Sequence, residues 1–483
     1  MRSDAGVSGD AQRIEQIVWL LFLKVYDAKE QEWELQDDNY RSIIPEHLQW
    51  RNWAIDNVDG KALTGDLLLD LVNNQLFPTL KKLPITPDMS LSKKIVQMVF
   101  SDVANYMKDG VQLRKVINEL NIVDFTESPD DLHAFGEIYE TILKDLQNAG
   151  NAGEFYTPRA VTDFMVEMVN PQLSDKVADF ACGTGGFLTS AIKHKEQFKK
   201  DAPDIETVNK TIYGIEKKPF PYLLAITNML LHGLDEPQIF HSNSLERNVR
   251  EYTEEEKFDV VLMNPPYGGG EKEIVKQNFP KHLQSSETAD LFMALIMYRL
   301  KRDGRAAVVL PDGFLFGNDG AKRNLKEKLL TGFNLHTVIR LPGSVFAPYT
   351  SIATNILFFG NTHGGTQNTW FYRMDKPEGY KHFSKTKPIL LKHFDPLREW
   401  WNNREAIIDA DGFDKAKSFA REELIARNFD IDLCKYPQII TEIPEPNELI
   451  RNYLTERERI DSEITATLDE IMALLNAQEV GDE

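Results

Sequence analysis

This chain has little cysteine, no excess of basic charge and few long hydrophobic runs. Among its 483 residues only Cys182 and Cys434 are cysteines, too few for a disulfide framework or a zinc cluster. The longest apolar run near the N-terminus, residues 17–23, is far shorter than the roughly 20 residues that a membrane span needs. No small-residue cleavage site flanks this run. We therefore expect no membrane anchor, no signal peptide and a cytoplasmic protein with reduced thiols.

The charge balance is acidic, with 55 Lys and Arg against 75 Asp and Glu and a formal net charge of −20. Such a field repels phosphates, which argues against a free-standing nucleic-acid binder. The acidic net charge does not exclude a local basic cleft, or a partner protein that contacts the nucleic acid. Hydrophobic residues make up 42% and charged residues 27%, which is typical of a folded protein rather than a disordered one.

The first part of the chain, residues 1–150, is predicted to be a helical domain. Apolar residues recur at helical spacing around Ile14 to Val25, Leu67 to Val72 and Ile138 to Leu143, and no stretch alternates as a strand does. The small, glycine-containing residues 148–153 form a plausible hinge at its end.

After the hinge, short strand-like runs alternate with amphipathic stretches, which predicts an α/β domain over residues 151–440. Its sheet is expected to be mostly parallel with helices on both faces, and its ligands to collect at the carboxyl ends of the strands. The predicted strands are Lys176–Phe180, Thr211–Ile215, Gln238–His241, Phe258–Met263, Arg305–Leu310, Leu335–Leu341 and Thr354–Phe359. Residues 363–368 are predicted to be a surface loop.

Residues 441–483 form a third predicted unit, an acidic helical tail that starts near Pro444. Apolar residues such as Ile460, Ile464 and Leu468 recur at intervals of three, four or seven along an otherwise charged helix. A seam this narrow fits either a terminal core helix or a coiled-coil arm that binds a partner.

A glycine-rich segment from Asp179 to Leu188 lies where the first strand turns into a helix. Glycines at such a turn let the backbone approach a ligand and point free amides at it. The spacing differs from the dinucleotide fingerprint, because Leu188 stands where a glycine or alanine is usual. No Lys-Ser/Thr pair follows, so a phosphate-binding P-loop is not expected either. A tight turn without a ligand remains the alternative.

Two further elements flank this turn. Glu216 ends the second strand, where an acidic side chain can accept both hydroxyls of a ribose, although a solvated strand end explains it equally well. Upstream, Thr157 is predicted to be the N-cap and Pro158 the first residue of a helix that ends before Pro171.

The sharpest signal is Asn264-Pro265-Pro266-Tyr267, directly after the strand Phe258–Met263. Proline has no N–H, so this turn presents carbonyl acceptors without competing donors, and the Asn264 side chain adds another acceptor. Tyr267 offers a flat ring. Two acceptors beside an aromatic face suit the exocyclic amino group of a planar ring.

Together these segments resemble the modification (M) subunit of type I restriction-modification systems, an N6-adenine DNA methyltransferase. The Asn-Pro-Pro-Tyr motif is specific to amino-group methylation as a class. The segments 154–159 and 305–313 narrow the match to the type I subunit. The resemblance implies a Rossmann-like methyltransferase fold and S-adenosyl-L-methionine as cofactor.

The resemblance also implies roles for single residues. The catalytic residues would be Asn264, Pro265, Pro266 and Tyr267, which hold a flipped-out adenine for attack on the methyl group. The cofactor-binding residues would be Glu154, Phe155, Tyr156, Thr157, Pro158, Arg159, Asp179, Thr184, Gly185, Gly186, Glu216 and Asn243. Asn243 departs from the acidic residue usual at that position. No metal site is expected, and Cys182 is interpreted as a small filler.

No segment reads as a separate target-recognition domain, so the resemblance implies a specificity subunit that reads the DNA sequence. Two copies of this chain would grip one such subunit, and a restriction/translocase subunit could complete the complex. Two alternatives stay open at this stage. One is a methyltransferase acting on RNA or on protein glutamine, and the other is a non-catalytic assembly subunit.

Overall fold

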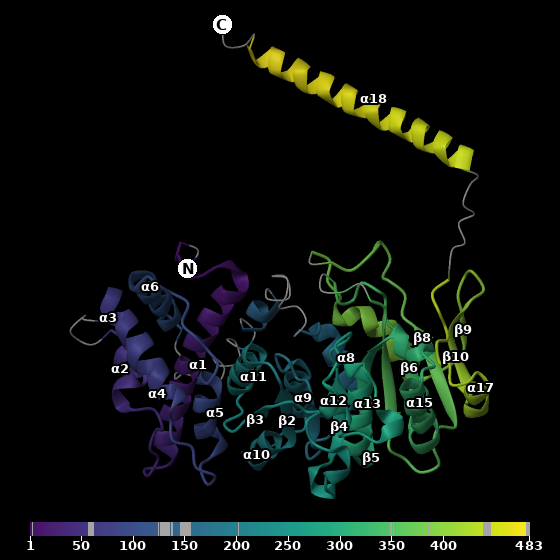
Figure 1. The fold of residues 1–483 in the computed structure, drawn as a ribbon. Helices are drawn as coiled ribbons and strands as arrows, with labels where there is room; N and C mark the ends of the chain where they lie inside the picture. The colour runs from purple at the N-terminus through teal and green to yellow at the C-terminus, as the bar shows by residue number, and fades with distance from the viewer. Residues whose placement is uncertain are drawn as a thin grey trace. The chain divides into compact units, whose positions relative to one another are not determined.

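In this computed structural model the chain divides into two compact units, Met1–Lys435 and Tyr436–Glu483 (Figure 1). The described residues are 1, 3–56, 62–123, 125, 136, 139–144, 156–200, 202–347, 350, 352–384, 386–437 and 446–479. Both predicted domain boundaries, near residues 150 and 440, lie outside the described residues, as do the predicted hinge, Glu154 and Phe155. The domain division therefore stays a prediction.

The N-terminal region is helical, as predicted, because its apolar side chains recur at helical spacing and pack on one another. The ring of Trp19 makes edge contacts with Phe77 and Phe100, with centroids 5.0 and 6.5 Å apart. The elements here are α1 Gly9–Gln36, η1 Glu46–Leu48, α2 Trp50–Trp53, α3 Gly65–Asp70, the π-helical η2 Leu71–Leu76, α4 Phe77–Lys81, α5 Leu91–Phe100 and α6 Gly110–Asn121.

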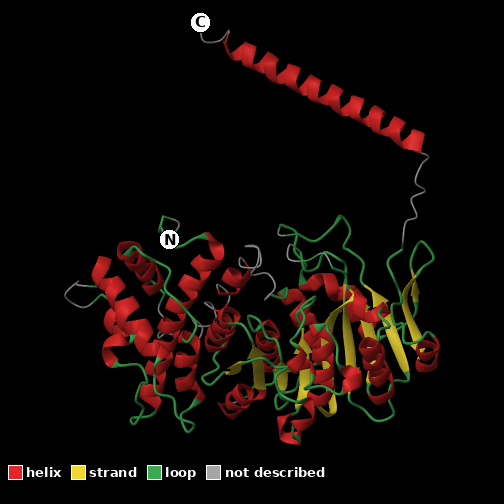
Figure 2. Cartoon of the chain, viewed as in Figure 1, coloured by secondary structure: helices red, strands yellow, loops and turns green. Residues whose placement is uncertain are grey.

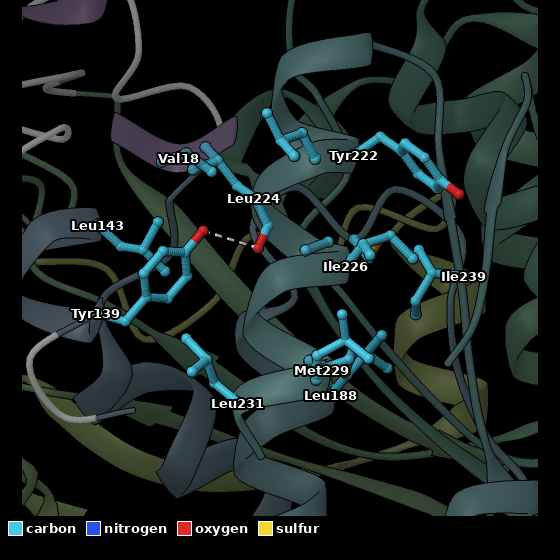
Figure 3. Close-up of a cluster of buried hydrophobic side chains, with 14 of the residues drawn as sticks. Val18, Tyr139, Leu143, Leu188, Tyr222, Leu224, Ile226, Met229, Leu231 and Ile239 are labelled. Atoms are coloured by element: carbon cyan, nitrogen blue, oxygen red, sulfur yellow. Dashed lines mark hydrogen bonds between the residues drawn. The ribbon is translucent and has the colours of Figure 1, made fainter. Parts of the chain in front are cut away.

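One hydrophobic core joins these helices to the sheet through α11 (Pro219–Leu231), which packs against α1. Figure 3 shows Val18 and Tyr139 beside Leu224 of α11, all fully or almost fully buried. The Tyr139 hydroxyl donates to the carbonyl of Leu224 over 3.1 Å. Every residue of α11 from Pro221 to Leu231 is buried, and this packing holds in place a helix that begins three residues after Glu216.

The sheet has ten strands in the order β3-β2-β1-β4-β5-β7-β6-β8-β10-β9. In this order, each strand from β3 to β5 is parallel to the next one. Strand β7 runs antiparallel to both of its neighbours, β5 and β6. Strands β6 and β8 are parallel. The strands are β1 Val177–Asp179, β2 Ile212–Glu216, β3 Gln238–His241, β4 Phe258–Met263, β5 Leu300–Pro311, β6 Asn334–Arg340, β7 Thr354–Gly360, β8 Asn368–Arg373, β9 Ile407–Ile408 and β10 Asp414–Ala420.

Helices cover both faces of the sheet, because alternate residues of each strand point to opposite faces (Figure 2). In β4, Val260 and Leu262 join the core under α8 (Arg159–Val169), α9 (Gly186–Glu196) and α11. Val261 and Met263 join the other core, under α13 (Thr288–Arg299) and α15 (Gly320–Gly332). Shorter helices connect the strands: α10 Ala202–Thr211, η4 Val249–Glu251, η5 Glu254–Glu256, α12 Glu273–Lys276, η6 Lys281–Leu283, α14 Asp312–Phe316, η7 Leu391–Phe394, α16 Asp395–Asn402 and α17 Arg421–Ala426.

The predicted fold class is confirmed, and all seven predicted strands are present as β1 to β7. The sheet is nevertheless wider than predicted, since β8, β9 and β10 follow Gly360. Strand β10 is Asp-Lys-Ala-Lys-Ser-Phe-Ala, mostly half-buried, and it pairs antiparallel with β8. Its polar composition lacks the apolar run that identifies a central strand.

The second unit contains α18 (Pro446–Glu479), the long terminal helix predicted from the sequence. Its acidic and basic side chains form ion pairs along the helix, such as Arg459 with Glu456. The apolar side chains of the seam are exposed: Leu449, Ile450, Tyr453, Leu454, Ile460, Ile464, Leu468, Ile471 and Met472. Among the described residues, no helix is long and apolar enough to cross a membrane.

Candidate functional site

A cavity of about 550 Å³ opens where β1, β2, β3 and β4 end. Carboxyl ends of adjacent parallel strands meet at one edge of a sheet, so segments that are far apart in sequence converge there. The cavity is lined by residues after each of these strands, by the segment that leads into α8, and by Phe346 and Thr350 from the β6–β7 connection.

Most of the predicted site residues share this cavity. They are Tyr156, Thr157, Asp179, Thr184, Gly186, Glu216, Asn243, Asn264, Pro265, Pro266 and Tyr267. Gly185, Pro158 and Arg159 do not line it. Gly185 has a φ of 82°, and a Cβ there would contact Met229, so this glycine makes the turn into α9 and faces the core.

Glu216 is buried and ties the second strand to the glycine-rich turn. One of its carboxylate oxygens accepts from the Gly183 amide over 2.9 Å, and the other accepts from the Lys218 amide over 2.8 Å. Burial raises the pKa of Glu216, and these amide donors oppose that shift. Each oxygen keeps acceptor capacity for a further donor, such as a hydroxyl of a ligand.

Asp179 is the second buried carboxyl group at the cavity, only 1% exposed at the end of β1. Burial raises its pKa to about 8, the Glu216 charge adds to the rise, and the Ala181 amide, 3.0 Å away, opposes it. Burial and these two carboxyl groups also raise the pKa of the Cys182 thiol. A thiol that stays protonated is a poor nucleophile, which supports the interpretation of Cys182 as a filler.

Asn264 is held between two hydroxyl groups at the start of the loop after β4. Its side-chain amide nitrogen donates to the Thr157 hydroxyl over 3.1 Å, and its amide oxygen accepts from the Tyr267 hydroxyl. The prediction that Thr157 is the N-cap of the next helix is wrong. Pro158 takes that position, α8 begins at Arg159, and the Thr157 side chain turns to Asn264 instead. The predicted end of α8 is correct, with Asn170 in the left-handed region before Pro171.

Arg159 lies behind the glycine-rich turn. Its guanidinium donates to both carboxylate oxygens of Glu140, over 2.5 and 2.7 Å, and stacks over the Tyr156 ring at 5.1 Å. Because the carboxylate offsets the cost of burial, the pKa of Arg159 is raised. A Cβ at Gly186 would lie 1.8 Å from the guanidinium, so a larger residue there would have to displace Arg159 from its contacts with Glu140.

Glu140 and Asn228 are residues of this site that the sequence did not reveal. The Asn228 side chain donates to Glu140 over 3.2 Å and to the Thr184 carbonyl over 2.9 Å. The network therefore braces the glycine-rich turn from the side of α8 and α11. No motif marks either residue, because their relation to the turn exists only after folding.

Asn243, two residues after β3, uses its side-chain oxygen to accept from the Leu245 amide over 3.1 Å. Its side-chain NH₂ group remains a possible donor at the cavity wall. An asparagine can therefore donate to a ring nitrogen, which the acidic residue expected at this position cannot do when ionised.

The chain matches two families of known proteins. Residues 130–443 match the family described as N-6 DNA Methylase, and residues 1–120 match the HsdM N-terminal domain. The sequence is 48% identical to the type I restriction enzyme EcoEI methylase subunit of Escherichia coli over 469 residues, which cover 95% of this chain and 93% of that one. It is 26% identical to the EcoKI methylase subunit of Escherichia coli K12, with 97% and 93% covered.

A solved structure resembles the whole chain. It comes from work on complex assembly and conformational transition of the type I restriction-modification system, and it superposes with a TM-score of 0.80 at 37% sequence identity. The superposition covers 98% of this chain and 95% of the other.

Proposed function

The chain belongs to the family of type I restriction enzyme methylase subunits, and we propose that it transfers a methyl group from S-adenosyl-L-methionine to N6 of adenine in DNA. The observation that carries this proposal is that Asn264 and Tyr267 share one cavity with the glycine-rich turn and Glu216. Asn264, which can accept from an amino group, and Glu216, which can accept from ribose hydroxyls, thus line the same cavity.

The residues at the cavity fit S-adenosyl-L-methionine. Thr184 is 3% exposed, and its hydroxyl has no partner among the described residues, so it is available to a ligand. The pKa values of the buried carboxyl groups Asp179 and Glu216 are both raised, and a ligand that carries positive charge would favour their ionised forms. We propose that Glu216 holds the ribose hydroxyls, Asn243 the adenine end, and Tyr156, Thr157, Thr184 and Gly186 the methionine part. When bound, the cofactor supplies an activated methyl group on a sulfonium.

Asn264 and Pro265 are proposed to activate the substrate nitrogen. The lone pair of adenine N6 is delocalised into the ring, so this nitrogen is a weak nucleophile. When the Asn264 side-chain oxygen and the Pro265 carbonyl each accept one N6 hydrogen, a pyramidal nitrogen with a free lone pair is favoured. Catalysis then rests on positioning and on preorganised acceptors.

Tyr267 is proposed to stack on the target base. A base cannot be reached inside a duplex, so it must be flipped out into the cavity. In the structure the Tyr267 hydroxyl donates to the Asn264 oxygen, the same atom proposed to accept from N6. This contact holds the amide oxygen toward the cavity before substrate arrives.

Tyr267→Ala is expected to weaken binding of the flipped base by about 1–3 kcal/mol, the usual range for aromatic stacking on a base. Tyr267→Phe is expected to keep most of the activity, because the ring remains and only the hydroxyl is lost. Affinity for DNA with a mismatched target adenine, together with methylation rates, measures both effects. If Phe is as damaging as Ala, the hydroxyl bond to Asn264 matters more than stacking.

Glu216→Gln is expected to raise the cofactor dissociation constant tenfold or more. The change replaces a charged acceptor with a neutral one, and hydrogen bonds to charged groups contribute about 1.5–3 kcal/mol. Calorimetric titration of the whole chain with S-adenosyl-L-methionine measures the change. Asn243→Asp is a useful companion, since it adds an acidic residue at the neighbouring strand end. Unchanged affinity in Glu216→Gln would return Glu216 to the role of a structural acceptor for the amides of Gly183 and Lys218.

The partners are proposed from the exposed seam of α18 and from the family. We propose that α18 docks on helices of a specificity subunit, with two copies of this chain for each such subunit, and that a restriction/translocase subunit joins them. The helical N-terminal domain is proposed to add contacts to DNA or to the partner. Because its substrate is genomic DNA, the enzyme is expected to work in the cytoplasm.

The decisive experiment is to incubate the chain with labelled S-adenosyl-L-methionine and DNA, with and without a co-expressed specificity subunit. N6-methyladenine in the digested DNA supports the proposal, whereas label on RNA or on protein glutamine contradicts it. Membership of a DNA methylase family does not favour those two substrates or a purely structural subunit.

A further inference from the structure

A short basic segment stands out in this acidic chain. Residues 376–393 contain five lysines, two histidines and a single acidic residue, Glu378, while the whole chain has a net charge of −20. The segment begins three residues after Arg373, the last residue of β8, and ends within η7. Local basic charge against a repulsive background indicates a specific use for that charge.

The positive side chains of this segment are available to a partner. Lys376, Lys381, Lys387 and Lys392 are exposed, and none of them forms an ion pair with a carboxylate in the part of the chain that the structure describes. Lysines outside the segment behave differently where carboxylates are near, as in Lys415 with Asp375 at 2.7 Å. The ammonium groups of Lys381, Lys387 and Lys392 are therefore exposed without an ion-paired carboxylate among the described residues. The Lys376 ammonium donates to the Lys381 carbonyl over 2.7 Å.

Aromatic side chains hold the segment in shape. The rings of Tyr380, Phe383 and His393 contact one another with centroids 5.3 to 5.7 Å apart. Phe383 is buried, and the Lys387 ammonium lies 5.5 Å from the Tyr380 ring. The segment is thus a packed loop with exposed lysines. Because the loop is already ordered, it loses less conformational entropy when it binds a partner.

The segment contacts the β6–β7 connection, which also reaches the candidate site. The Phe383 amide donates over 2.9 Å to the side chain of Ser344, in the β6–β7 connection that brings Phe346 and Thr350 to the site cavity. A second cavity, of about 330 Å³, lies between them and is lined by Tyr156, Val345, Phe383 and Ile389. Strands β6 and β8 run parallel, so both connections leave the sheet at the edge where β4 ends (Figure 1).

We infer that this basic segment binds phosphates of the DNA strand that carries the target adenine, next to the flipped base. The inference rests on the proposed function, which requires that strand to reach the cavity beside Asn264. Lysine is a flexible point charge suited to phosphates and carries no base preference, so the contact would position the strand without reading its sequence. An acidic protein surface is the other class of partner that the charges fit. Proximity to the site cavity favours DNA.

The test replaces Lys376, Lys381, Lys387 and Lys392 together with glutamine and measures DNA affinity of the complex with the specificity subunit across salt concentrations. The logarithm of the binding constant falls linearly with the logarithm of the salt concentration, and each phosphate contact contributes about 0.9 to this salt slope. The slope is therefore expected to become shallower by about 2–4. Affinity at low salt is expected to fall on the order of 10–100-fold, for cognate and non-cognate duplexes alike.

A matched control carries the same change of charge at the opposite edge of the sheet. Lys176 directly precedes β1, Lys210 precedes β2 within α10, and Lys199 and Lys200 lie between α9 and α10. Replacing these four lysines with glutamine is expected to leave the salt slope within about one unit of the unsubstituted complex. Thermal melting and cofactor titration of both variants check that each chain is folded.

The outcomes separate the inference from the function on which it rests. If the unsubstituted complex methylates adenine but the first variant keeps the full salt slope, the inference is wrong and the function stands. If the variant no longer assembles with the specificity subunit, the segment binds protein and the inference is also wrong. If the unsubstituted complex binds DNA but never methylates it, the proposed function fails, while the salt slope still reports on the segment.

Discussion

Asn264→Ala is expected to lower the methylation rate on the order of 10²–10³, the usual cost of losing one preorganised group that acts as charge develops. Cofactor affinity is expected to stay nearly normal, because the proposed cofactor contacts come from other segments: Thr184, Glu216 and Asn243. Single-turnover methylation and calorimetric cofactor titration on the same preparation separate the two effects.

The contacts of Asn264 allow a sharper comparison than alanine alone. Its nitrogen donates to Thr157 and its oxygen accepts from Tyr267, so the two ends of the amide have different tasks. Asn264→Asp keeps an acceptor toward the cavity but loses the donor to Thr157. Thr157→Val removes the other partner of that bond. Because Thr157 is also proposed to contact the methionine part of the cofactor, cofactor affinity is measured for this variant as well. We expect Thr157→Val to be mild, Asn264→Asp intermediate and Asn264→Ala the most damaging.

Near-normal turnover in Asn264→Ala would contradict the assigned role. A large loss of cofactor affinity in the same variant would also contradict it, because Asn264 would then belong to the cofactor site. Melting temperature is the control for folding, since Asn264 lies at the end of a central strand and links it to the segment before α8.

Removal of the chain after Pro444 is expected to abolish assembly with the specificity subunit and DNA methylation, while cofactor binding stays intact. The removed part contains α18, whose apolar residues from Leu449 to Met472 are exposed. An exposed apolar seam on a long charged helix is typical of a surface that a partner helix covers. The first compact unit, Met1–Lys435, keeps every described residue of the candidate site.

Point variants within α18 test the seam without removing the helix. Ile464→Gln with Leu468→Gln disrupts the seam and keeps good helix formers. Glu448→Gln with Glu470→Gln is the matched control, because at 100° per residue these positions lie on the side of the helix opposite Ile464 and Leu468. Co-purification with the specificity subunit is expected to fail for the first pair and to persist for the second.

The lone chain is expected to bind cofactor but to show little affinity for duplex DNA. Its net charge of −20 opposes the counterion release that supplies most non-specific affinity. A gel shift in which the lone chain binds one duplex sequence tightly at physiological salt would overturn the proposed dependence on a partner. Equal binding by the truncated and full-length chains to the specificity subunit would overturn the role of α18.

The sequence by itself determined the class of fold, the seven strands β1 to β7 and the long C-terminal helix. Those features depend on local signals: apolar runs of strand length, helical spacing, and turn residues between them. The same local signals marked Asp179, Glu216 and Asn264, since each lies at the carboxyl end of a largely buried strand. A strand end is recognisable from its own neighbours, so these positions did not require knowledge of the rest of the chain.

Tertiary structure alone decided which of these residues share a cavity and what each side chain contacts. Threonine is a residue type that often caps the start of a helix, but the Thr157 hydroxyl accepts from the side chain of Asn264, 107 residues away. Glu140 and Asn228 brace the glycine-rich turn without any motif, and the polar strand β10 enters the sheet only because β8 offers an edge. The physical reason is common to all three: a hydrogen-bond partner or a sheet edge that is distant in sequence outweighs local preference.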